Sequence, residues 1–154
     1  MSIDECLVSL MDAHEQRLYT FLLMLLRNHA PAEDCTRDTF WRAYENLREG
    51  KPVHALWLFM VARDRAMEEL RHQVRIRPGQ GHVEPIASTD ECDNNHGVWQ
   101  AIRRLPDSDC EVLYLFAVEW FKTDEIGMIL HVRERAVRRQ LCHARQCFQA
   151  LCER

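Results

Sequence analysis

The stretch from Leu105 to Leu151, LPDSDCEVLYLFAVEWFKTDEIGMILHVRERAVRRQLCHARQCFQAL, decides how the second half of the chain folds. A helix is expected after Pro106, a short helix near Thr123, and a long basic helix after a break at His131–Val132. This order is typical of a helix-turn-helix, in which two helices meet at a tight turn and the second lies in a DNA groove. The stretch therefore predicts a small helical domain with a surface for duplex DNA.

The long basic helix has two distinct faces. Apolar residues recur along it at steps of four and three, which predicts the face that packs on the rest of the domain. These residues are Val137, Leu141, Ala144, Phe148 and Leu151. Most arginines lie off this stripe and near the start of the helix, where a helix-turn-helix contacts bases. A solvated cationic face without a DNA role is the alternative interpretation.

Helix starts are also marked in this stretch. Ser108 and Glu111 have the spacing of a capping box. Thr123 precedes two acidic residues, as expected for the N-cap of a short helix. One more short helix is expected over residues 98–105, ending before Pro106.

The first half of the chain has the same helical character. Apolar residues at helical spacing predict helices over residues 4–27, 31–47 and 53–75. The connections between these helices are short, which favours an antiparallel bundle.

Residues 77–96 differ from the rest of the chain. They contain glycines, prolines and a cluster of Ser, Thr, Asp and Asn, and they have no apolar period, so a flexible linker is predicted. The sequence thus predicts an all-α protein with two small helical domains, 1–76 and 97–154, joined by this linker.

Composition and charge limit the possible functions. The chain has 154 residues, of which 47% are hydrophobic, and this is enough for one ordinary domain or two small ones with packed cores. The formal net charge of −4 excludes a chain that is basic overall, although arginines concentrate after His131. The N-terminal residues lack a basic segment before their apolar residues, and Leu22–Leu26 is too short to span a bilayer. A cytoplasmic location without membrane insertion is therefore expected.

The cysteines do not complete a metal site by themselves. There are seven, and no CxxC motif occurs. His143 and Cys147 share one helix face, whereas Cys142 and Cys152 point elsewhere. Further ligands would have to come from Cys110 or the linker. No metal or other cofactor is predicted, and the thiols are interpreted as packing groups in a reducing compartment.

No enzymatic motif stands out. The adjacent acids Glu33–Asp34 and Glu68–Glu69 diverge on a helix, so they do not form a catalytic pair. A glycine-rich phosphate loop, GxSxG and HExxH are all absent from the sequence. The chain is therefore not expected to be an enzyme.

Two pairs of segments resemble a known family. Residues 32–47 (AEDCTRDTFWRAYENL) and 57–75 (WLFMVARDRAMEELRHQVR) resemble region 2 of bacterial RNA polymerase sigma factors. Residues 105–120 and 123–148 resemble region 4. The order of these segments around a short linker resembles the extracytoplasmic-function (ECF) group of the sigma-70 family, and the resemblance covers nearly the whole chain. It implies a region 2 helix bundle and a region 4 helix-turn-helix.

This resemblance implies a function and its partners. An ECF sigma factor directs core RNA polymerase to specific promoters and initiates transcription without enzymatic activity of its own. The implied partners are core RNA polymerase, promoter DNA and an anti-sigma factor.

The resemblance also implies three groups of site residues. Docking on the clamp of the polymerase would involve Asp34, Arg37, Asp38, Phe40 and Trp41. Opening and holding the −10 promoter element would involve Arg63, Asp64, Arg71, His72 and Arg75. Contacts with the −35 element in the major groove would involve Arg133, Arg135, Arg138, Arg139, His143 and Arg145.

Several positions depart from the usual family pattern. The family often has Gly at the turn where His131 stands, and a capping Ser where Arg133 stands. A missing cap costs about 1 kcal/mol, and a non-glycine residue at positive φ costs about as much. The remaining departures are Arg37 for Gln, Asp64 for Asn, Ala136 for Thr and His143 for Arg. These changes affect promoter affinity and sequence preference more than the fold.

Two alternative functions remain open. One is a diverged sigma-like adaptor that acts by protein contacts and binds DNA weakly. The other is a metal- or thiol-responsive transcription regulator that uses Cys142, His143, Cys147 and Cys92.

Overall fold

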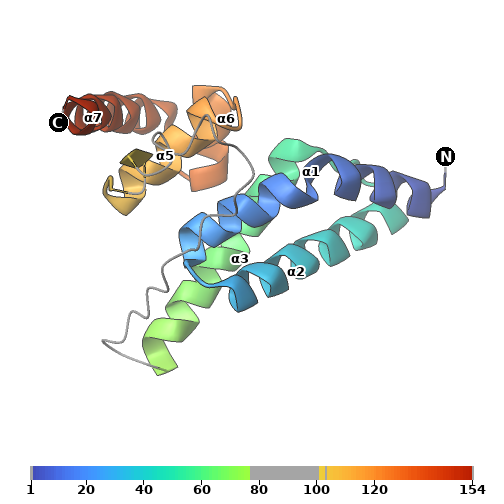
Figure 1. Ribbon diagram of the computed structural model, residues 1–154. Helices are drawn as coiled ribbons and strands as arrows, with labels where there is room; N and C mark the ends of the chain where they lie inside the picture. Colours follow the sequence, from blue (N-terminus) through green and yellow to red (C-terminus); the bar gives the residue numbers. More distant parts are fainter. Residues whose placement is uncertain (1, 77–100, 103, 154) are drawn as a thin grey trace. The chain divides into compact units, whose positions relative to one another are not determined.

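The computed structural model describes residues 2–76, 101–102 and 104–153, and these residues are helical with short connections (Figure 1). The chain divides into two compact units, Met1–Ile86 and Ala87–Arg154. The predicted all-α fold with two small helical domains is confirmed. The predicted linker, 77–96, lies outside the described residues, and the domain bounds at its ends stay a prediction.

Three helices build the first unit. They are α1 (Ile3–Leu26), α2 (His29–Arg48) and α3 (Ala55–Ile76). Helix α1 begins with a capping box in which the Ser2 hydroxyl accepts from the Glu5 N–H and the Ser2 N–H donates to the Glu5 carboxylate. It ends at Arg27, whose φ of 53° is left-handed, and Asn28 then caps α2. The tight connection makes α1 and α2 antiparallel, as Figure 1 shows.

The core of this unit lies where the three helices contact one another. Leu18, Phe21 and Leu22 of α1 and Leu58 and Phe59 of α3 are fully buried. The rings of Phe21 and Phe59 have centroids 5.3 Å apart, with a tilted geometry that aromatic pairs favour. The apolar spacing read from the sequence therefore predicted the packed face of α1.

Helix α2 presents small and polar groups to this core. Thr36 and Thr39 are buried, and each hydroxyl donates to the carbonyl oxygen four residues earlier, at 2.8 and 2.7 Å. Burial raises the pKa of the Cys35 thiol to about 11. Cys35 is therefore a neutral packing group at neutral pH, as the sequence predicted.

Three helices with described bounds build the second unit. They are α5 (Asp107–Ala117), α6 (Thr123–Leu130) and α7 (Glu134–Cys152), and α7 contacts both of the others. Their shared core comprises Tyr114, Leu115, Ile126, Ile129, Val137, Leu141 and Ala144. In the connection between α5 and α6, Trp120 adopts a φ of 62° and its side chain is 84% exposed.

Three local predictions for this unit were wrong. Pro106 rather than Ser108 is the N-cap of α5, because the proline backbone leads directly into the helix and no side chain caps it. Lys122 rather than Thr123 is the N-cap of α6. The short helix expected over 98–105 does not reach Leu105, which lies in a bend; residues 98–100 and 103 lie outside the described residues.

Candidate nucleic-acid interface

The start of α6 is tied to the start of α7 by hydrogen bonds. The backbone N–H of Lys122 donates to the Glu125 carboxylate at 3.0 Å, which satisfies one donor at the N-terminus of α6. The Thr123 hydroxyl donates to Glu134 Oε1 of α7 at 2.8 Å. Arg138 Nη2 donates to the same Glu134 oxygen at 2.7 Å. Thr123 therefore joins the two helices of the motif instead of capping one of them.

The turn between α6 and α7 requires a close backbone approach. A Cβ atom on Gly127 would lie 2.8 Å from the carbonyl oxygen of Val132, which is too close for any other residue without movement. The N–H of Val132 donates to the Gly127 carbonyl at 3.0 Å and closes the turn. Gly127 thus fixes how closely α7 approaches the end of α6.

Two departures from the family pattern have the expected conformations. His131 ends α6 with a φ of 57°, the left-handed region that favours glycine. Arg133 occupies the N-cap of α7 in an extended conformation, and its side chain makes no capping hydrogen bond to that helix. Each departure costs about 1 kcal/mol, so the start of α7 is less stable than a glycine turn and a serine cap would make it.

The exposed face of α7 carries the predicted arginines. Val137, Leu141 and Ala144 are buried, whereas every arginine predicted to contact the −35 element is exposed. At 100° per residue, Arg135 and Arg139 lie nearly opposite the buried stripe. Neither forms an ion pair with a carboxylate among the described residues. These two guanidinium groups are available to an anionic ligand.

Arg138 and Arg145 have partners within the unit. Arg138 pairs with Glu134, one turn earlier on α7. The guanidinium carbon of Arg145 lies 5.0 Å from the centre of the Phe116 ring, in a cation–π contact. These contacts orient both side chains on the flanks of the exposed face.

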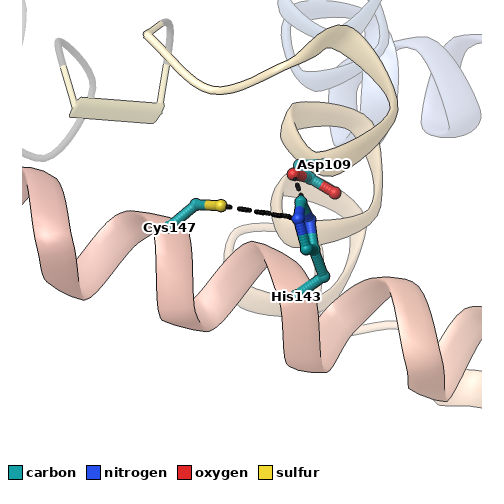
Figure 2. Close-up of side chains that lie close together, drawn as sticks. All are labelled: Asp109, His143 and Cys147. Carbon is teal, nitrogen blue, oxygen red and sulfur yellow. Dashed lines mark hydrogen bonds and ion pairs between the residues drawn. The ribbon is translucent and has the colours of Figure 1, made fainter.

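His143 lies in a different environment from the arginines. Its Nδ1 lies 2.7 Å from Oδ2 of Asp109, a buried residue of α5 (Figure 2). At 100° per residue, His143 also lies on the other side of the buried stripe from Arg138 and Arg145. The structure therefore separates His143 from the arginine face with which it was grouped.

Sequence reasoning missed Asp109. Its side chain is fully buried, although an acidic residue in the first turn of a helix usually faces solvent. Asp109 precedes His143 by 34 residues, so their contact depends on how α5 packs on α7. The one sequence signal was an acidic residue at a core-facing helical position, three residues before Val112.

The residues predicted to contact the −10 element all lie on α3. Arg71, His72 and Arg75 are exposed near its end, while Arg63 and Asp64 are half-buried in its middle. Arg65, next to Asp64 on α3, forms ion pairs with two carboxylates of the same unit. Its Nε lies 3.0 Å from Asp38 Oδ2, and its Nη1 lies 3.4 Å from Glu68 Oε2. The helix continues without a break to Ile76.

The residues predicted to dock on the polymerase lie on α2, but they differ in exposure. Asp34 and Arg37 are exposed and form an ion pair with each other. Trp41 is 60% exposed, beside the ring of Tyr44. Asp38 is half-buried between Arg42 and Arg65.

Phe40 was predicted to belong to the docking surface, but it is largely buried. It is only 5% exposed, because it packs into the bundle core. One edge of the ring reaches a shallow groove that Leu7, Trp41, Tyr44 and Arg48 also line. Trp41 is therefore the large apolar side chain that this part of α2 offers to a partner.

Comparison with protein families agrees with these two units. The sigma-70 region 2 family matches residues 10–76, and the sigma-70 region 4 family matches residues 96–148. The chain belongs to the sigma-70 family. It has regions 2 and 4, as ECF sigma factors do, so the family resemblance seen in the sequence is confirmed. Sigma factors are not enzymes, and this ECF sigma factor acts in the initiation of transcription.

Three relatives of known name are similar to this sigma factor. The ECF RNA polymerase sigma factor SigM of Bacillus subtilis is 27% identical over 166 residues, covering 100% of this chain and 97% of SigM. The RNA polymerase sigma factor CarQ of Myxococcus xanthus is 26% identical, covering 81% of this chain and 76% of CarQ. The probable RNA polymerase sigma factor RfaY of Xanthomonas campestris is 26% identical over 80% of this chain, which spans only 34% of RfaY.

Solved structures share the fold of this sigma factor. RpoE of Bartonella quintana, solved with the anti-sigma factor NepR, has a TM-score of 0.71 at 19% identity and matches 93% of this chain and 94% of its own. CnrH, solved with the cytosolic domain of CnrY, has a TM-score of 0.66 at 19% identity and matches 97% of this chain and 89% of its own. None of the described helices combines the length and the apolar character that a membrane crossing needs.

Proposed function

We propose that the two regions of this ECF sigma factor bind different parts of the transcription complex. Region 2, residues 1–76, binds core polymerase through α2 and holds the −10 element along the exposed end of α3. Region 4, residues 97–154, contacts the −35 element with α7. The observation that supports this division most concerns Arg135 and Arg139, on the outer face of the second helix of a helix-turn-helix. Neither pairs with a carboxylate in the part of the chain that the structure describes.

The proposed −35 surface consists of arginines only. Arg135 and Arg139 face outward for contacts with bases, and Arg133, Arg138 and Arg145 flank them for contacts with phosphates. His143 is left out, because a buried carboxylate holds its ring on the side of α7 toward α5. A guanidinium that contacts guanine contributes about 1–3 kcal/mol of discrimination.

On the polymerase side, the proposed surface is centred on Trp41. Asp34, Arg37 and Asp38 surround it with charge. In protein interfaces, the residues that contribute most to the binding free energy are often aromatic side chains or arginines surrounded by a polar rim. Trp41 also lines a shallow groove together with Leu7, Phe40, Tyr44 and Arg48, and an apolar patch with a polar rim is typical of a protein interaction site.

An anti-sigma factor is also proposed as a partner. RpoE and CnrH, which share the fold, were solved with NepR and CnrY. The proposed location is the cytoplasm, where core polymerase and the chromosome are found.

Run-off transcription with core polymerase tests the proposal. Wild-type protein is expected to form a stable complex with core and to produce a defined transcript, and Trp41→Ala is expected to weaken the complex. Val8→Ala, which removes an exposed apolar side chain of α1, is the control. Failure of the wild type to bind core would contradict the proposal.

Binding to promoter duplex distinguishes a promoter-binding sigma factor from the first alternative, a sigma-like adaptor. A sigma-like adaptor with weak DNA binding would be consistent with two features: the left-handed turn residue His131, and the N-cap Arg133, which makes no side-chain capping bond to α7. Each phosphate contact adds about 0.9 to the slope of log affinity against log salt. A steep slope that flattens in Arg133→Ala supports promoter binding. The control is Arg104→Ala, which removes one exposed cation of region 4 outside the motif. A flat slope in the wild type supports the adaptor.

A further inference from the structure

Three metal-ligating side chains meet where α7 packs on α5. Asp109 comes from the first turn of α5, and His143 and Cys147 come from successive turns of α7 (Figure 2). Their donor atoms all lie within 4.8 Å of one another. The sulfur of Cys147 lies 3.8 Å from His143 Nε2 and 3.9 Å from Nδ1.

The carboxylate in this cluster is unusually placed. Asp109 is fully buried, and a buried charge is costly unless it is paired or binds a metal. One of its oxygens, Oδ1, accepts a hydrogen bond from the Gln140 side chain. The other, Oδ2, is directed at His143. Gln140 is held in turn by a 3.4 Å contact with the Ser108 hydroxyl.

This arrangement matches the surroundings of a metal ligand. Ligating carboxylates are themselves hydrogen-bonded by neighbouring groups that fix their orientation, as Gln140 does here. His143 and Cys147 are four residues apart, which places both on one face of α7. Cys142, next to His143 in the sequence, is exposed on a different face and does not belong to the cluster.

We propose that Asp109, His143 and Cys147 form a zinc site that joins α7 to the first turn of α5. A thiolate, an imidazole and a carboxylate are the ligands that Zn²⁺ takes in proteins, and three protein ligands leave a fourth position open. With metal–ligand distances of about 2.0–2.3 Å, tetrahedral ligand atoms lie roughly 3.3–3.7 Å apart. The cluster reaches this geometry if Asp109 Oδ2 and His143 Nδ1 separate slightly and Cys147 moves closer.

Protons accompany binding. Cys147 binds as the thiolate, and its thiol proton is released to solvent. The neutral imidazole of His143 binds through Nδ1, so its one proton moves from the side facing Asp109 to Nε2 and none is released from the ring. The metal replaces one hydrogen bond between α5 and α7 by three coordination bonds, which stabilises region 4 in the arrangement that presents the arginine face.

Cobalt titration of the full-length, reduced and metal-free protein tests the site. Co²⁺ bound by a thiolate in tetrahedral geometry gives a sulfur-to-metal charge-transfer band and intense visible bands, and Zn²⁺ should abolish both. His143→Ala and Cys147→Ser each remove one ligand, and we expect at least a 100-fold loss of affinity, more than the 10–100-fold that loss of a supporting group costs.

Matched controls separate this site from adventitious thiol binding. Cys142→Ser removes an exposed thiol one residue from His143, and Cys152→Ser removes another at the end of α7. Both should bind Co²⁺ and Zn²⁺ as the wild type does. Absence of the charge-transfer band in the wild type would overturn the proposal, and so would an equal loss in Cys142→Ser and Cys147→Ser.

Gln140→Ala tests the positioning role of Gln140. The charge-transfer band should persist with an affinity reduced about 10- to 100-fold. Asp109→Asn removes a ligand but also a buried charge, so its fold must be checked by circular dichroism. His143→Ala and Cys147→Ser decide the question if Asp109→Asn does not fold.

Discussion

The ion pairs on α2 of region 2 and the outer face of α7 in region 4 use charged side chains in opposite ways. In region 2, Asp38 lies between Arg42 and Arg65, and Asp34 pairs with Arg37, so these charges hold helices and turns together. In region 4, Arg135 and Arg139 pair with no carboxylate of the described residues. Paired charges contribute to the stability of the fold, whereas unpaired charges of one sign can bind an external ligand of opposite charge. The same residue type, arginine, thus has a structural role at Arg42 and Arg65 and a proposed binding role at Arg135 and Arg139.

The largest effect should come from the core of region 2. Phe59→Ala removes a fully buried ring that packs on Phe21 in a tilted geometry, and the expected loss is about 3–5 kcal/mol. If the two compact units fold independently, amide hydrogen exchange should increase throughout α1–α3 and stay unchanged in α6 and α7. Val74→Ala, an exposed position of the same helix, should change neither. Equal acceleration in both regions would show that they are a single cooperative unit.

A somewhat smaller loss is expected at the turn of region 4. Gly127→Ala forces a Cβ against the Val132 carbonyl, and such overpacking costs about 1–3 kcal/mol. Because α7 must then shift from α6, affinity for promoter duplex should fall as well, while binding to core polymerase through region 2 stays. Met128→Ala changes the next, exposed residue and should leave DNA binding intact. Wild-type affinity in Gly127→Ala would disprove the link between this turn and the arginine face.

The left-handed residues offer a gain instead of a loss. His131→Gly should stabilise region 4 by about 0.5–1 kcal/mol, because glycine adopts positive φ without steric cost. Arg27→Gly, at the equivalent helix end in region 2, should produce a gain of the same sign. Thermal unfolding of the two variants measures both. Destabilisation in His131→Gly alone would mean that the histidine side chain itself supports the turn.

The smallest effect is expected from the ion pairs of region 2. Asp38→Asn weakens the attraction to both Arg42 and Arg65, and because all three side chains are partly exposed the loss should be only about 0.2–0.5 kcal/mol. Asp34→Asn, in a fully exposed pair, should cost less still. Urea denaturation compares the two. A larger loss for Asp34 would reverse the ranking of the two pairs.

The sequence predicted the fold well because its main determinants are local. Helical spacing of apolar residues located the packed faces of α1 and α7, and Leu18 and Val137 are buried as that spacing requires. Helix starts were harder, because Ser108 and Thr123 fit a cap pattern while the neighbouring backbone at Pro106 and Lys122 began the helices. A cap depends on one residue's backbone angles, and a sequence pattern does not determine those angles.

The sequence predicted the site residues only where the position of a residue on a helix face determines whether its side chain is exposed. The exposed arginines of α7 were on the face that the apolar stripe left open. The family resemblance grouped Phe40 with the docking residues, but Phe40 is only 5% exposed in the helix bundle. The Asp109–His143 contact joins two helices whose relative register is set by packing, so sequence spacing contained no information about it.

Glu134 determines how easily Arg138 can change partners. One oxygen of its carboxylate accepts from both Thr123 and Arg138. If Arg138 swings to a phosphate, the bond from Thr123 remains, so the carboxylate is not left unsatisfied and the two helices stay joined. Arg138 can therefore exchange the Glu134 carboxylate for a DNA phosphate at little enthalpic cost. Region 4 is thus preorganised for DNA, and its two helices stay joined whether or not DNA is bound.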